Sequence, residues 1–158
     1  MTKGVFAAIL LTLAASASAQ EKTPPYWASI ASGEAMMRTG PGKNYPGVWL
    51  YKRRDLPIRV LKIHENWRLI EDSEGTRGWM LRTMLSDTRT AIVKGSEPRP
   101  VHANADEGSR VRYLAEPGVV GRIDECSSGW CHIKFGTREG HIKVADLWGV
   151  AEGETVED

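Results

Sequence analysis

The sequence predicts an all-β protein made of two tandem small β-barrels. Apolar runs are short and are separated by Gly, Pro, Asn and Asp, and past the N-terminal segment none keeps a helical period for more than about three turns. One order of motifs also occurs twice: Trp67 precedes Gly75-Thr76-Arg77 and Gly78, and Trp130 precedes Gly136-Thr137-Arg138 and Gly140. Units of roughly 50 to 60 residues cannot cover both faces of a flat sheet, so we expect each to curl into a barrel.

The N-terminal segment Met1–Ala19 has the pattern of a signal peptide. Lys3 provides a short positive region, Val5–Ala15 is an apolar run too short to span a bilayer, and Ala17-Ser18-Ala19 is a small-residue cleavage site. We predict cleavage after Ala19 and a periplasmic or secreted protein that is not inserted in the membrane afterwards. No cysteine follows the cleavage site to carry a lipid anchor.

The charge balance argues against nucleic acid or an anionic membrane as a partner. The chain has 21 Lys and Arg and 20 Asp and Glu, and removal of Lys3 with the signal peptide leaves 20 of each. The one tight basic run, Lys52-Arg53-Arg54, is typical of a solvated turn. The acidic tail, residues 151–158, has almost nothing apolar to bury and is expected to be disordered.

The two cysteines agree with export. Cys126 and Cys131 flank a four-residue segment with turn chemistry, so they can face each other across a hairpin and form a disulfide in an oxidising compartment. Free thiols and a zinc site that includes His132 are the alternatives. The zinc site is disfavoured because Cys131 and His132 would point to opposite faces of a strand.

Several motifs of the first repeat resemble the bacterial SH3-like (SH3b) family, in particular its periplasmic two-copy members. They are Arg38-Thr39-Gly40-Pro41-Gly42, Tyr45-Pro46 and Gly78-Trp79-Met80. In the second repeat, residues 102–106 replace the opening loop, and His141 stands where Trp79 stands. The resemblance implies two SH3-like barrels with a single 3₁₀ turn at Leu81–Leu85 and another at Lys143–Leu147.

We predict a first SH3-like domain over residues 26–93 and a second over 97–150. Thr90–Val93 is β-prone and is expected to complete the first barrel, while Trp148–Val150 takes the matching place after the second. The short link between the units predicts that the barrels pack against each other.

The sequence gives no sign of an enzyme, a cofactor or a metal site. The four histidines are scattered along the chain, and no Ser or Asp accompanies them in a known nucleophile pattern. The loop Thr39-Gly40-Pro41-Gly42 lacks the Lys-Ser or Lys-Thr of a phosphate-binding loop. Trp67 and Trp130 are interpreted as core residues.

Aromatic residues around the opening loop of the first repeat form a candidate ligand-binding groove. Its residues are Arg38, Tyr45, Trp49, Tyr51 and Trp79. Hydrophobic packing is the alternative for Tyr45, Trp49 and Tyr51. With the resemblance, this groove indicates a non-catalytic exported binding module for a peptidoglycan peptide or another cell-envelope component. The alternative function is a periplasmic protein–protein adaptor with no cell-wall ligand.

Overall fold

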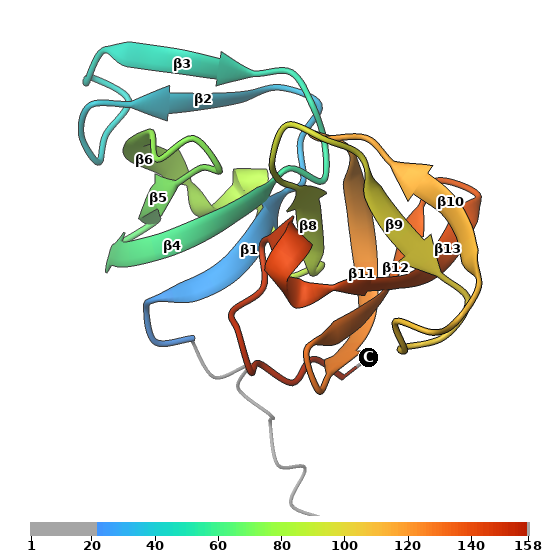
Figure 1. Ribbon diagram of the computed structural model, residues 1–158. Coiled ribbons are helices and arrows are strands. Elements are labelled where there is room, and N and C mark those ends of the chain that lie inside the picture. The colour runs from blue at the N-terminus through green and yellow to red at the C-terminus, as the bar shows by residue number, and fades with distance from the viewer. Residues whose placement is uncertain (1–21, 158) are drawn as a thin grey trace, which may run out of the picture.

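The computed structural model describes residues 22–157 and contains two antiparallel sheets, each curved around its own core (Figure 1). The all-β prediction with two tandem SH3-like barrels is confirmed. The predicted signal peptide lies outside the described residues. Within residues 22–157, the structure has no helix with the length and apolar character needed to cross a membrane.

The first sheet holds seven strands in the order β3-β2-β6-β5-β4-β1-β7. Their bounds are β1 Tyr26–Ile30, β2 Ala35–Arg38, β3 Gly47–Tyr51, β4 Pro57–His64, β5 Trp67–Glu71, β6 Arg77–Leu81 and β7 Leu85–Ser86. The 3₁₀ turn η1 (Arg82–Met84) joins β6 to β7.

The second sheet repeats this order strand for strand as β10-β9-β13-β12-β11-β8-β14. Its strands are β8 Thr90–Val93, β9 Arg99–His102, β10 Val111–Ala115, β11 Val120–Ser127, β12 Trp130–Phe135, β13 Arg138–Lys143 and β14 Leu147–Trp148. The 3₁₀ turn η2 (Val144–Asp146) precedes β14, so both predicted 3₁₀ turns are confirmed.

Strand β8 belongs to the second barrel, so the expectation that Thr90–Val93 completes the first barrel is wrong. Ile92 pairs with Val120 on β11 and Val93 pairs with Leu147 on β14, just as β1 pairs with β4 and β7 in the first sheet. Ala91 and Val93 are buried in the second core. The prediction that Trp148–Val150 matches Thr90–Val93 is also wrong. Leu147–Trp148 forms β14, which has the position in the second sheet that β7 has in the first.

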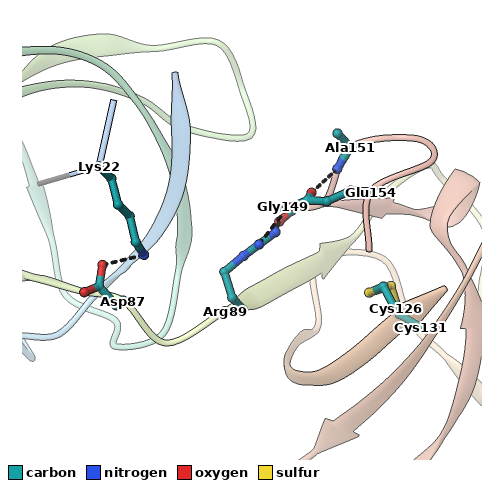
Figure 2. Close-up of polar contacts among 8 residues, drawn as sticks. All are labelled: Lys22, Asp87, Arg89, Cys126, Cys131, Gly149, Ala151 and Glu154. Carbon is teal, nitrogen blue, oxygen red and sulfur yellow. Dashed lines mark hydrogen bonds and ion pairs between the residues drawn. A yellow bond between two sulfur atoms is a disulfide. The ribbon is translucent and has the colours of Figure 1, made fainter. Parts of the chain in front are cut away.

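The acidic tail is ordered up to residue 157, contrary to the predicted disorder. Val156 exchanges two backbone hydrogen bonds of 2.9 and 3.0 Å with Cys126 and is only 7% exposed. Glu154 accepts hydrogen bonds from Arg89 Nη1 at 2.7 Å and from the Ala151 backbone N–H at 2.8 Å (Figure 2). One apolar residue and one paired carboxylate therefore suffice to dock the tail on the second barrel.

Each sheet buries the inward residues of its strands. The largest fully buried side chains are Ile30, Met37, Ile58, Val60, Ile70 and Met80 in the first core and Val93, Val101, Ile133, Ile142 and Leu147 in the second. Trp67 is buried, as expected. Trp130 is partly exposed, because its neighbour Cys131 takes the inward position on β12.

A repeated glycine lets two strands cross closely in each barrel. A Cβ atom on Gly78 would lie 2.4 Å from Met37 Cγ, and one on Gly140 would lie 2.6 Å from Val101 Cγ1. Any larger residue would force these core side chains to move. The glycine that follows each Gly-Thr-Arg motif is thus a packing requirement.

The two barrels pack against each other, as their short link predicts. The rings of Trp27 and Trp148 lie 4.8 Å apart, Arg122 Nη2 lies 2.9 Å from Asp55 Oδ2, and Arg53 donates a hydrogen bond to the carbonyl oxygen of Gly118. Figure 1 shows β8 of the second sheet beside β1 and β4 of the first.

Candidate functional site

A groove of about 260 Å³ lies on the first barrel at its junction with the second. The first barrel contributes β3, the start of β4 and the β5–β6 loop, and the second barrel contributes one side chain of β8. The lining residues are Trp49, Tyr51, Leu56, Pro57, Ile58, Asp72, Ser73, Glu74, Thr76 and Ile92.

Trp49 forms an exposed aromatic wall of this groove. It pairs in register with the buried Met37, but β3 is the edge strand of its sheet, so the indole extends beyond the core and is 59% exposed. Its ring meets the ring of Tyr51 edge to face at a centroid distance of 6.5 Å. A large, rigid aromatic surface is therefore available to a ligand.

Tyr51 links this wall to the β5–β6 loop through Asp72. The phenol donates a 2.7 Å hydrogen bond to Asp72 Oδ2, and Asp72 Oδ1 accepts from the backbone N–H groups of Glu74 and Thr76 at 3.0 and 2.9 Å. Burial raises the pKa of the phenol, and the hydrogen bond to Asp72 and the charges of Asp72 and Glu74 raise it further. Tyr51 therefore stays a neutral donor, and the loop is fixed against β3.

The lining combines apolar and polar groups in a way that suits a peptide. Leu56, Pro57, Ile58 and Ile92 provide apolar surface, the carboxylates of Asp72 and Glu74 are negative, and Ser73 and Thr76 offer hydroxyl groups. A segment with an apolar part and an amino group would match both the aromatic wall and the negative charge.

The other three predicted groove residues lie apart from this groove. Arg38 pairs in register with Trp79 and lies on the opposite face from its buried neighbour Met37, and its Nη1 donates a 2.8 Å hydrogen bond to the Tyr45 carbonyl oxygen. The Tyr45 ring packs on Gly40, where a Cβ atom would lie 2.3 Å from Tyr45 Cδ1. The structure thus brings together Trp49 and Tyr51 and separates them from Arg38, Tyr45 and Trp79.

Of the ten lining residues, sequence reasoning found Trp49 and Tyr51 and missed the other eight, among them Asp72 and Ile92. Asp72 opens the turn Asp72-Ser73-Glu74-Gly75, a position where Asp side chains often accept hydrogen bonds from the following backbone, and this signal could have found it. Ile92 had no such signal, since its place depends on which barrel β8 joins.

The second barrel does not repeat the chemistry of the groove. Tyr113 takes the place of Trp49, opposite the buried Val101, and Ala115 takes the place of Tyr51. The guanidinium of Arg138 lies 5.5 Å from the centroid of the Tyr113 ring. In the second barrel the aromatic ring thus lies beside a guanidinium group, whereas in the first barrel Tyr51 contacts the carboxylate of Asp72.

The cysteine pair is a disulfide in the structure. Cys126 on β11 and Cys131 on β12 are register partners, and their Sγ atoms lie 1.99 Å apart (Figure 2). Both side chains are buried in the second core. Sulfur atoms bonded in this way leave no thiolate for a metal ion.

Three of the four histidines lie side by side, although the sequence indicated that they are scattered. His141 on β13 pairs in register with His102 on β9 and with His132 on β12. His64 is on the first barrel, where its ring meets Trp79 at 6.2 Å. The pairing of β13 with its sequence neighbour β12 and with the distant strand β9 produces this row.

Comparison with known proteins gives a match to a family model and a similarity to one curated protein. The family model described as "Bacterial SH3 domain" matches residues 31–87 and again residues 95–149. The chain is 25% identical over 127 residues to the predicted N-acetylmuramoyl-L-alanine amidase YrvJ of Bacillus subtilis (strain 168), which corresponds to 73% of this chain and 24% of that protein. The chain thus spans about a quarter of the length of this relative.

Among solved structures, NlpC2 from Trichomonas vaginalis matches with a TM-score of 0.35 and 10% identity, over 81% of this chain and 49% of that chain. NlpC1 from the same organism matches with a TM-score of 0.34 and 13% identity, over 87% and 50%.

Proposed function

Because the chain belongs to the bacterial SH3 domain family, we propose that it is a non-catalytic binding module of the cell envelope, exported to the periplasm or secreted. Its ligand is a peptidoglycan peptide or another envelope component, bound in the groove of the first barrel. The observation that carries the proposal is the wall formed by Trp49 and the Tyr51–Asp72 pair.

The comparisons support a ligand related to the cell wall. The relative YrvJ carries the name of an N-acetylmuramoyl-L-alanine amidase. The groove supports a peptide as the ligand, since its apolar surface and carboxylates complement an aliphatic segment that ends in an amino group.

We propose that the two barrels act as one module and that the boundary between them lies at residues 87–89, between β7 and β8. Ile92 of the second barrel lines the groove of the first. The contact between Trp27 and Trp148 holds the barrels in one arrangement, so ligand affinity depends on both.

Co-sedimentation with purified cell-wall sacculi tests the proposal. Trp49→Ala should weaken binding by about 1 to 3 kcal/mol, which is a loss of affinity of about 5- to 150-fold. Leu114→Ala is the matched control, because Leu114 is 60% exposed on β10, the equivalent edge strand of the second barrel. Equal binding of the wild-type protein and Trp49→Ala, with the fold intact by circular dichroism, would rule out this groove.

The non-catalytic part of the proposal has its own test. The protein is incubated with purified peptidoglycan, and released muropeptides are measured by chromatography. Release that persists after rigorous purification of the protein would show that it is an enzyme.

A second candidate function, a protein–protein adaptor, is favoured by the free edge of β3. Met36, Val48 and Leu50 are exposed large apolar side chains on β2 and β3, and an edge strand can accept a strand from a partner. For an adaptor, sacculi stripped of protein should not bind the chain, whereas unstripped envelopes should.

A further inference from the structure

His132 and His141 are neighbours on the outer face of the second barrel. They are register partners on β12 and β13, and their ring centroids lie 4.9 Å apart. Their sequence neighbours Cys131, Ile133, Gly140 and Ile142 take the buried positions, so both imidazoles lie on the solvent side of the sheet.

The Nδ1 atom of each ring contacts an oxygen atom that can only accept a hydrogen bond. His132 Nδ1 lies 3.0 Å from the carboxylate oxygen Oδ2 of Asp124, and His141 Nδ1 lies 3.2 Å from the carbonyl oxygen of Ala103. Each Nδ1 must therefore carry the proton, and in the neutral ring the lone pair is on Nε2.

The two acceptors also orient the rings. Asp124 lies on β11, next to β12, whereas Ala103 follows β9, next to β13. The Nδ1 atoms are thus held toward opposite sides of the pair, and the Nε2 lone pairs point away from those acceptors. A histidine that binds a metal ion is typically held in this way, with its other ring nitrogen bonded to a carboxylate or carbonyl group.

We propose that His132 and His141 bind one late first-row transition-metal ion through their Nε2 atoms. Imidazole suits Cu²⁺, Zn²⁺ and Ni²⁺, and Cu²⁺ is bound most tightly of these by a given set of nitrogen ligands. No three His, Cys, Asp or Glu side chains of residues 22–157 form a group able to hold a metal ion, so the protein supplies two ligands and water completes the coordination.

The charged groups around the pair balance one another. Lys134 Nζ lies 2.7 Å from Asp124 Oδ2, and Lys143 pairs with Glu107. Each lysine near the histidines is therefore paired with a carboxylate, which limits repulsion of an incoming cation. His102 is not counted as a ligand, because its ring packs edge to face on Trp130 with centroids 5.3 Å apart.

Titration of the tag-free, disulfide-bonded protein with Cu²⁺ by calorimetry, followed by electron paramagnetic resonance, tests this site. We expect one Cu²⁺ per chain and a spectrum with two imidazole nitrogens, with Zn²⁺ bound more weakly. His132→Gln and His141→Gln should each abolish this site, and Asp124→Ala should weaken it about 10-fold or more, because the carboxylate that orients the His132 ring is lost.

His64→Gln is the matched control, since it removes an imidazole from the first barrel and should bind Cu²⁺ like the wild-type protein. Circular dichroism of every variant checks that the barrels remain folded. The proposal is overturned if the wild-type protein binds no Cu²⁺, if only one imidazole nitrogen is seen, or if the His132 and His141 variants bind as tightly as the His64 variant.

Discussion

The indole ring of Trp27 on β1 meets the indole ring of Trp148 on β14 edge to face, with centroids 4.8 Å apart and planes inclined by 82°. Trp27 also lies under the guanidinium group of Arg59, which is 5.7 Å from its ring centroid. The aromatic contact joins one barrel to the other near the end of each sheet, where β1 and β14 lie.

A double-mutant cycle measures how strongly this contact couples the barrels. With Trp27→Ala and Trp148→Ala, urea denaturation should give a coupling free energy of about 1 kcal/mol, the usual value for an aromatic pair beyond its buried area. Trp49→Ala combined with Trp148→Ala is the control and should be additive, because Trp49 lies on β3 at one edge of the first sheet, whereas β1, which Trp148 contacts, lies near the other edge. An additive Trp27 and Trp148 pair would show that the barrels are not coupled there.

Removing the Tyr51 hydroxyl should destabilise the first barrel. Tyr51→Phe breaks the 2.7 Å hydrogen bond to Asp72, so the free energy of unfolding should fall by about 1 kcal/mol in urea denaturation. Tyr113→Phe is the control: within residues 22–157 the Tyr113 hydroxyl is buried without a hydrogen-bond partner, so its removal should cost nothing. Equal losses in the two variants would contradict this role of Asp72.

Docking of the tail should depend on pH through Glu154. Burial raises the pKa of Glu154, but the hydrogen bonds from Arg89 and Ala151 and the charge of Arg89 outweigh burial and hold the pKa below its ordinary value of 4.5. Because the folded state lowers this pKa, the carboxylate stabilises the protein above pH 4.5, and this stabilisation is lost as pH falls through the folded-state pKa.

Thermal unfolding of the wild-type protein and Glu154→Gln over a pH series checks this dependence. The difference in stability should be full at pH values above 4.5 and should shrink as the wild-type carboxylate is protonated. A difference that stays constant into strong acid would mean that Glu154 does not hold the tail through its charge.

The disulfide should stabilise the second barrel modestly. Closing so short a loop restricts the unfolded chain by about 2 kcal/mol on the chain-entropy estimate, so the Cys126→Ser, Cys131→Ser double variant should lose about that much stability. Mass spectrometry of exported protein, with and without reductant, should show the loss of two hydrogen atoms. Two free thiols in that material would refute the pairing.

Local signals were sufficient to predict the barrels. Trp67 and Trp130 begin equivalent strands, and the Gly-Thr-Arg motif that follows each of them marks the connection to the next strand in both sheets. Gly78 and Gly140 lie at equivalent close crossings of two strands. The 3₁₀ turns were predicted from the family pattern.

Several of the errors involve contacts between segments distant in sequence. Thr90–Val93 has the same β propensity whichever barrel it joins, and only its pairing with β11 and β14 decides the matter. Val156 looked too isolated to order the tail, yet Cys126 provides a backbone partner for it. Arg38 and Met37 lie on opposite faces of β2, so Arg38 is separated from Trp49, which is the register partner of Met37. The side-by-side placement of His102, His132 and His141 depends on the lateral register of β9, β12 and β13.

The pairing of β1 with β7 has a consequence for the order in which the barrels fold while the chain is synthesised from its N-terminus. The last strand of the first sheet ends at Ser86, and every strand of that sheet precedes β8. The first barrel can therefore close as soon as residue 86 has been synthesised, while the second is still incomplete, and it presents its completed surface, including Trp27, for the second barrel to fold against.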